Sequence, residues 1–171
     1  MCTNVLTLFA QNGREQELTE MFNWVIAILH HGAFLGGTGY YCSPDAFLHF
    51  VTRLVIKLRK PCLRDRLVQP LQQRLGERVG MDGGPASLTM RVLACKRLGI
   101  PNSRDLNRLR EMQCEDGSWP VEWIYKYSYT GLKVGNRGLT TALAVQAIET
   151  PITGIATIEL SNAAIRSPSF F

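Results

Sequence analysis

Five aromatic residues gather in one short stretch of this sequence, and their ring faces could do chemistry: Trp119, Trp123, Tyr125, Tyr127 and Tyr129. The face of an aromatic ring attracts positive charge, so such a cluster could line a cavity in which a cation develops. The same residues could equally pack into an apolar core. Cavity lining and core packing therefore both stay open at this point.

Basic residues accompany the aromatic cluster and also form a larger group elsewhere in the chain. Lys126, Lys133 and Arg137 could meet a diphosphate group, and the net charge of the whole chain is +5. A second basic group spans residues 53–78 and could be a solvated helix face or an anion or partner site. Nucleic-acid binding is not expected, because no known motif or interleaved aromatic platform is present.

Histidines and cysteines show no metal-ligand spacing. The chain has five cysteines without a C-x-x-C pair, so we expect reduced thiols, a cytoplasmic protein and no metal site. Cys95 falls in an apolar helical run and is predicted to be a buried, inert residue. The most apolar window, residues 21–35, is short and broken by polar residues, so no transmembrane segment is expected.

Apolar residues recur with helical spacing along most of the chain. Helices are predicted near residues 14–31, 43–58, 63–79, 86–98, 102–112 and 138–148, with Pro70 kinking or dividing the third. Segments 86–98 and 138–148 are apolar on most sides and so require burial on most sides. Their alternation with stripe-faced helices predicts paired inner and outer helices of an α/α toroid, and an irregular helical bundle is the alternative.

The segment from Gln113 to Trp119 lies between a predicted outer and a predicted inner helix and has the pattern Q-x3-G-x-W. A glutamine amide can bond to nearby backbone at a helix end, glycine permits a tight turn, and an indole can stack on the glutamine. The segment resembles the QW repeat of squalene-hopene cyclases, oxidosqualene cyclases and other terpenoid-cyclase and prenyltransferase-barrel proteins. The resemblance implies a structural role for Gln113, Gly117 and Trp119.

A longer resemblance covers residues 2–149, through segments 4–9, 40–47, 91–95, 123–127 and 135–144. It looks like the terpene-cyclase-like region of fungal proteins associated with haloacid-dehalogenase-type phosphatase domains. This implies an all-α fold, a partial α/α toroid over residues 1–149, and a loosely ordered C-terminal extension over residues 150–171. Because the chain begins within an already apolar helix, an upstream part is expected to be missing.

The resemblance also locates a candidate for catalysis. Class II-type cyclisation begins when a carboxylic acid in an aspartate-rich element donates its proton to an alkene and becomes a carboxylate. That element corresponds to the segment from Asp82 to Pro85, where the first aspartate is present and Gly84 stands at the position of the acid. Asp82 is therefore the candidate proton donor, and a glycine-rich turn between helices is the alternative.

The function implied is a terpenoid-cyclase-like domain of fungal sesquiterpene or meroterpenoid biosynthesis. We expect a fragment or divergent member that binds a prenyl diphosphate rather than an autonomous cyclase, with Mg²⁺ only if such a substrate brings it. A catalytic or phosphatase partner domain would lie outside this chain, and a non-catalytic helical interaction module is the alternative. The predicted substrate-binding residues are Trp119, Trp123, Tyr125, Tyr127, Lys133 and Arg137.

Overall fold

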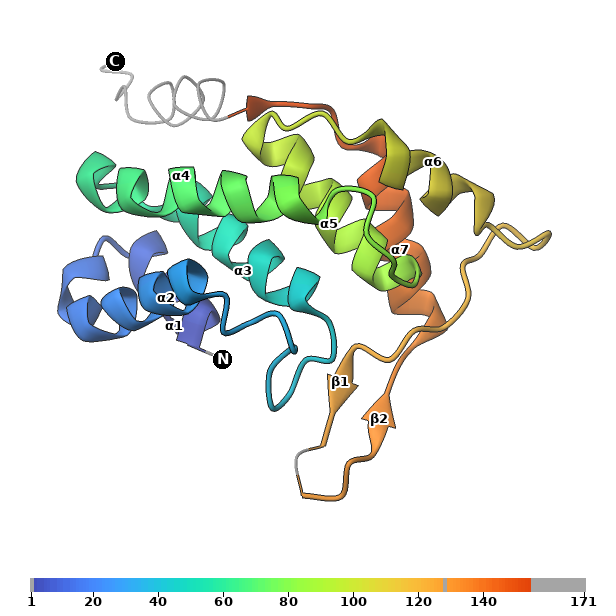
Figure 1. Cartoon of the computed structure of the whole chain (residues 1–171), viewed down its shortest axis with the longest axis horizontal. Helices are drawn as coiled ribbons and strands as arrows, with labels where there is room; N and C mark the ends of the chain where they lie inside the picture. The colour runs from blue at the N-terminus through green and yellow to red at the C-terminus, as the bar shows by residue number, and fades with distance from the viewer. Residues whose placement is uncertain (1, 128, 155–171) are drawn as a thin grey trace, which may run out of the picture.

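A computed structural model describes residues 2–127 and 129–154, and these are mostly helical (Figure 1). The helices are α1 (Cys2–Gln11), α2 (Thr19–His31), α3 (Pro44–Lys57), α4 (Pro61–Arg78), α5 (Pro85–Leu98), α6 (Ser103–Glu111) and α7 (Arg137–Glu149). A short 3-10 helix, Glu15–Leu18, precedes α2, and strands β1 (Tyr125–Lys126) and β2 (Lys133–Val134) pair antiparallel. The predicted all-α class is confirmed.

Local sequence signals explain where these helices begin. The Ser43 side chain accepts a hydrogen bond from the backbone N–H of Asp45 and caps α3, while Asn102 and Asn136 cap α6 and α7 in the same way. Helices α3, α4 and α5 each have a proline in their first turn, where no backbone N–H is needed.

Helix α4 differs from the prediction. Pro70 lies inside one continuous helix from Pro61 to Arg78 and does not divide it. The apolar face formed by Leu67, Leu71 and Leu75 is fully buried on both sides of the proline, so tertiary packing outweighs the lost hydrogen bond.

The helices lie in two rows. Contacts join α1 to α3, α3 to α5 and α5 to α7, while α2, α4 and α6 pack against the outside of this row. This pairing of inner and outer helices is what the predicted toroid requires. The closed toroid itself, and the domain boundary at residue 149, stay predictions.

The two helices that the sequence predicts to be buried on most sides, α5 and α7, differ in how fully they are covered. Helix α5 is buried along nearly its whole length, because it packs against α3, α4, α6 and α7. Helix α7 buries Thr140, Ala144 and Ala147 but leaves Leu139 and Val145 exposed. Among the described residues, α7 is therefore covered on one side, and the burial expected on most sides is not seen.

The start of the predicted C-terminal extension packs on the end of α5. Lys96 Nζ donates to the backbone oxygens of Ala147 and Thr150, each at 2.7 Å, and the Thr153 N–H donates to the Lys96 oxygen. Residues 155–171 of that extension lie outside the described residues. In the part of the chain that the structure covers, no helix is both long and apolar enough to cross a membrane.

Candidate functional site

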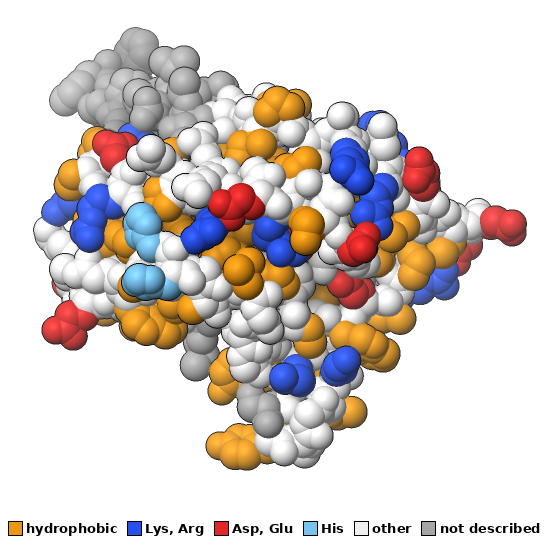
Figure 2. All heavy atoms as spheres, in the orientation of Figure 1, with side chains coloured by type: hydrophobic (Ala, Val, Ile, Leu, Met, Phe, Trp, Pro, Cys, Tyr) orange, Lys and Arg blue, Asp and Glu red, His pale blue; other side chains and the backbone are white. Residues whose placement is uncertain are grey.

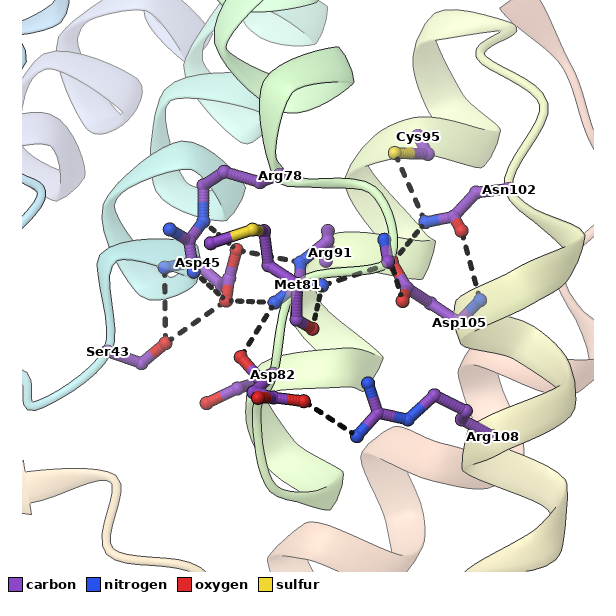
Figure 3. A network of polar contacts seen from close by, with 12 residues as sticks. Ser43, Asp45, Arg78, Met81, Asp82, Arg91, Cys95, Asn102, Asp105 and Arg108 are labelled. Carbon is purple, nitrogen blue, oxygen red and sulfur yellow. Dashed lines mark hydrogen bonds and ion pairs between the residues drawn. The ribbon is translucent and has the colours of Figure 1, made fainter.

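A buried ionic network lies next to the candidate loop and joins four helices (Figure 3). Arg91 on α5 contacts Asp45 on α3 at 2.9 Å and Asp105 on α6 at 3.2 Å, and Arg78 on α4 contacts Asp45 at 2.7 Å. The side chains of Arg91, Asp45 and Asp105 are 0% exposed. Two positive and two negative groups face one another, so their charges balance inside the protein.

Nearby opposite charges keep Asp45 and Arg91 ionised. Burial alone raises the pKa of Asp45, but the guanidinium groups of Arg78 and Arg91 outweigh burial and hold the pKa below its usual value. Burial likewise lowers the pKa of Arg91, and its two aspartate partners more than offset that effect. Both groups stay charged at neutral pH, so Asp45 is an ion-pair partner and not a proton donor.

The network fixes the loop that carries Asp82. Arg91 Nη1 donates to the Met81 oxygen at 2.8 Å and Arg91 Nη2 to the Asp82 oxygen at 3.5 Å. The Asp105 carboxylate accepts from the Gly80 N–H, and Gly80 has a positive φ of 80°. The backbone of the loop is therefore held from inside by Arg91 and Asp105.

The Asp82 side chain points away from the network (Figure 3). It is 101% exposed and lies 3.3 Å from Arg108 Nη2 on α6. Catalytic acids that protonate weak bases usually lie in apolar pockets that exclude water. The surroundings of Asp82 are those of a surface ion pair in an interhelix turn.

A different carboxylate occupies the position of the expected acid. A Cβ atom added at Gly84 would lie 2.6 Å from Cδ of Glu122, so the Glu122 carboxylate fills the space of a side chain at position 84. It accepts hydrogen bonds from the Ser87 N–H at 2.9 Å and from the Ser87 hydroxyl at 2.6 Å. Because Gly84 caps α5 without a side chain, Glu122 supplies the missing cap from a distant loop.

The approach of Glu122 depends on a second glycine. A Cβ atom at Gly135 would lie 2.3 Å from the Glu122 backbone oxygen. The cleft beside the carboxylate, lined in part by Ser43, Met90 and Trp123, has a volume of about 10 Å³. Such a volume holds about one water molecule, so an isoprenoid chain does not fit beside Glu122 in this conformation.

The residues of the Q-x3-G-x-W pattern meet at the end of α6. Gln113 Nε2 donates to the Gly117 oxygen at 2.9 Å, and Gly117 has a positive φ of 80°. Trp119 is 1% exposed, its indole N–H donates to the Leu109 oxygen at 2.6 Å, and it packs in a cluster with residues of α5 and α7. The structure thus places Trp119 in the core and not in a cavity wall.

The other candidate aromatic residues lie on or near the β1–β2 hairpin, which projects from the helices (Figures 1 and 2). Tyr125 stacks on Tyr40 with ring centroids 5.8 Å apart. Trp123 and Tyr127 are each 50% exposed. Among the described residues, Trp119 therefore lies in the core while Trp123 and Tyr127 lie at the surface.

Two of the predicted cationic ligands, Lys133 and Arg137, lie at the protein surface. Lys133 lies exposed on β2, and Arg137 at the start of α7 pairs with Asp116 at 3.0 Å. The structure describes no group of three or more histidine, cysteine or acidic residues able to hold a metal ion within residues 2–127 and 129–154. Cys95 is fully buried, and burial raises its pKa to about 12, so the thiol is inert as expected.

Comparison with known proteins gives one informative relative. Drimenol cyclase drtB of Aspergillus calidoustus is 46% identical over 148 residues, which are 86% of this chain and 28% of that protein. The chain is homologous to part of a terpene cyclase. It therefore spans 28% of the length of this relative, and the terpene-cyclase relationship implied by the sequence is supported.

Other comparisons add no relationship. No protein-family model matches the chain, and no solved structure matches it. The wider toroid superfamily and the association with haloacid-dehalogenase-type domains accordingly stay predictions.

Sequence reasoning overlooked Glu122 and Asp105 as site residues. Asp105 carries a signal in its sequence, because it stands three residues after the helix cap Asn102, but that position indicates local capping and not a contact with Arg91. Glu122 carries no comparable signal, because its partner Ser87 is 35 residues away along the chain.

Proposed function

We propose that this chain is a terpenoid-cyclase-like domain of fungal isoprenoid biosynthesis that binds a prenyl diphosphate and does not cyclise it alone. Homology to a drimenol cyclase supports the pathway and the substrate class. The single observation that carries the second half of the proposal is at position 84. The place of the expected acid is held by Gly84 and filled by the hydrogen-bonded carboxylate of Glu122.

Glu122 is a poor replacement for the missing acid. Both of its carboxylate oxygens accept hydrogen bonds from Ser87, which hold the carboxylate against the first turn of α5. Asp82 is open to water and paired with Arg108. Asp82 is exposed and Glu122 is only partly buried, so neither carboxylate has the water-excluding surroundings that protonation of an alkene requires.

The size of the relative supports a domain that works with other parts. The chain corresponds to 28% of the drimenol cyclase, and α7 presents Leu139 and Val145 without cover from the described residues. Further helices, in the same chain or in a partner, would bury this face and complete a toroid around a substrate cavity.

Incubation of the purified chain with farnesyl diphosphate and Mg²⁺ tests the proposal. We expect saturable binding by calorimetry and no cyclised product by gas chromatography with mass spectrometry. A cyclised product that disappears in Asp82→Asn would overturn the non-catalytic part. Absence of binding would overturn the substrate part, and farnesol serves as the control that lacks the diphosphate.

A helical interaction module is the second candidate function. The exposed side chains of Tyr129 and Leu132 on the hairpin, together with the open face of α7, favour it. A saturable protein partner whose binding is unchanged by farnesyl diphosphate, and lost when Leu132 is replaced by Asp, would support this function over prenyl diphosphate binding.

A further inference from the structure

A pocket that the candidate site does not use lies between α1, α3, α5 and the segment that follows α7. It has a volume of about 370 Å³. Its wall includes three basic side chains and several hydroxyl groups, notably Arg53, Lys57, Arg97, Thr7, Thr150 and Thr153. The pocket is near the C-terminal ends of α3 and α5, whereas Asp82 and Glu122 lie near the N-terminal end of α5.

The positive charges in this pocket have no acidic partner among the described residues. No aspartate or glutamate lines the pocket. Arg53, Lys57 and Arg97 are absent from the ion pairs formed within residues 2–127 and 129–154. Elsewhere in the same structure, by contrast, the buried arginine Arg91 is matched by two carboxylates.

The cations also act on one another and on a neighbour. Burial lowers the pKa of the half-buried Arg97, and the charge of Arg53 lowers it further. His49 on α3 is buried, and Arg97 and Arg53 add to the effect of burial in lowering its pKa to about 4. Nearby positive charge thus lowers the pKa of both Arg97 and His49, in addition to the effect of burial.

Helix dipoles explain part of this arrangement. Lys57 and Arg97 lie in the last turns of α3 and α5, where the backbone carbonyl groups favour positive charge. Arg53 lies one turn before the end of α3 and adds repulsion toward Arg97. The dipoles therefore account for two of the three charges. All three charges line one pocket, and such a concentration of positive charge favours the binding of an anion.

We propose that this pocket binds a phosphate-type oxyanion, with diphosphate as the preferred ligand, through Arg53, Lys57 and Arg97. Guanidinium groups offer paired N–H donors that match two oxygens of a phosphoryl group, and the ammonium group of Lys57 adds a point charge. The volume exceeds the needs of one phosphate and suits a diphosphate. The inference does not depend on the proposed function, because free diphosphate and the head of a prenyl diphosphate share this chemistry.

Calorimetric titration of the full chain with inorganic pyrophosphate at low ionic strength tests the proposal. We expect saturable binding that weakens at least tenfold in Arg53→Gln/Arg97→Gln and is retained in the matched control Arg104→Gln/Arg110→Gln, whose exposed residues lie outside the pocket. Equal affinity in the pocket variant, or no binding by the unaltered chain, would overturn the site.

Thermal unfolding keeps the result interpretable if the variant is altered in stability. If the pocket binds the anion, pyrophosphate raises the midpoint temperature of unfolding of the unaltered chain and leaves that of Arg53→Gln/Arg97→Gln unchanged. If the cations served only the helix dipoles, the variant would unfold at a lower temperature and pyrophosphate would not shift the midpoint of either protein, which would contradict the proposal.

Competition between pyrophosphate and farnesyl diphosphate identifies the source of the anion. Mutual displacement, lost in the pocket variant, assigns the site to the head of a prenyl diphosphate. Pyrophosphate binding that farnesyl diphosphate does not displace assigns it to a free anion. Farnesyl diphosphate binding that survives in Arg53→Gln/Arg97→Gln places the prenyl substrate elsewhere. The pyrophosphate titration then shows by itself whether this pocket binds an anion.

Discussion

At the scale of single residues, position 84 is shaped by a side chain from a distant loop. The Glu122 carboxylate lies where a Cβ atom at Gly84 would be, and it bonds to Ser87 in the first turn of α5. Glycine at position 84 therefore leaves room for Glu122, from a distant part of the same chain, to cap α5. A terpene-cyclase-like aspartate could return to position 84 only if Glu122 moved or changed.

Replacement of Gly84 by Asp tests this relationship. We expect Gly84→Asp to lower the free energy of unfolding by about 2 kcal/mol, because two carboxylates would compete for one space. The double variant Gly84→Asp/Glu122→Ala should recover most of that loss, since the new aspartate can cap α5 itself. Gly36→Asp is the matched control, because a Cβ there meets nothing within 4 Å. Strictly additive effects in urea unfolding would show that the two positions are not coupled.

A second residue-scale prediction concerns His49 and pH. Its pKa in the folded protein is about 4, below the usual 6.5, because of burial and the charges of Arg97 and Arg53. The unfolded chain therefore takes up a proton before the folded chain does, so stability falls as the pH drops from about 6.5 toward about 4.

Urea unfolding at two pH values measures this effect. Between pH 7.5 and pH 5 the His49 contribution should lower the free energy of unfolding by about 2 kcal/mol. His49→Gln should remove that part of the pH dependence, and His31→Gln, at an exposed position, should leave it in place. An unchanged pH dependence in His49→Gln would contradict the assignment.

At the scale of helices and loops, the segment after α6 connects the outer and inner rows. Trp119 inserts among α5, α6 and α7 and donates to the Leu109 oxygen, while Gln113 and Gly117 close the turn before it. Arg91 performs a similar task between α3 and α6 through charged groups. Each device joins elements whose order along the chain does not by itself dictate their contact.

Two tryptophan substitutions separate a packing role from a surface role. Trp119→Ala should lower the free energy of unfolding by about 3–5 kcal/mol, because a large buried side chain and its hydrogen bond are lost. Trp123→Ala, at a half-exposed position, should cost less than about 1 kcal/mol. Similar losses for both variants in chemical denaturation would argue against a core role that is special to Trp119.

At the scale of the whole molecule, α7 has a face that the other described residues leave partly exposed. Leu139 and Val145 are exposed on a helix whose composition suits burial on most sides. The relative is longer than this chain, which spans 28% of it. Under the proposed function, further helices would cover this face.

Charged substitutions on α7 test whether this face is free in the isolated chain. Leu139→Glu/Val145→Glu should change the free energy of unfolding by no more than about 0.5 kcal/mol, because exposed positions tolerate such changes. Ala144→Glu, on the buried side of the same helix, should cost about 3 kcal/mol or more. Strong destabilisation by the first pair would mean that the chain already covers this face.

The sequence by itself determined the features that depend on neighbours along the chain. These features are the helical spacing, the caps formed by Ser43, Asn102 and Asn136, and the turn from Gln113 to Gly117. Each depends on residues that are close together in the sequence, so the sequence predicts it. The all-α class was predictable for the same reason, whereas the relationship to terpene cyclases was predicted from the resemblance of residues 2–149 to a known family.

Tertiary structure alone decided which distant groups meet. The contact of Glu122 with Gly84, the balance of Arg91 by Asp45 and Asp105, and the convergence of Arg53 with Arg97 join residues that are far apart in sequence. No periodicity records such contacts, because they depend on how helices pack and not on how each one forms. Packing also kept Pro70 inside α4, buried Trp119 and turned Asp82 toward solvent. Residues that could do chemistry were thus visible in the sequence, and their surroundings were not.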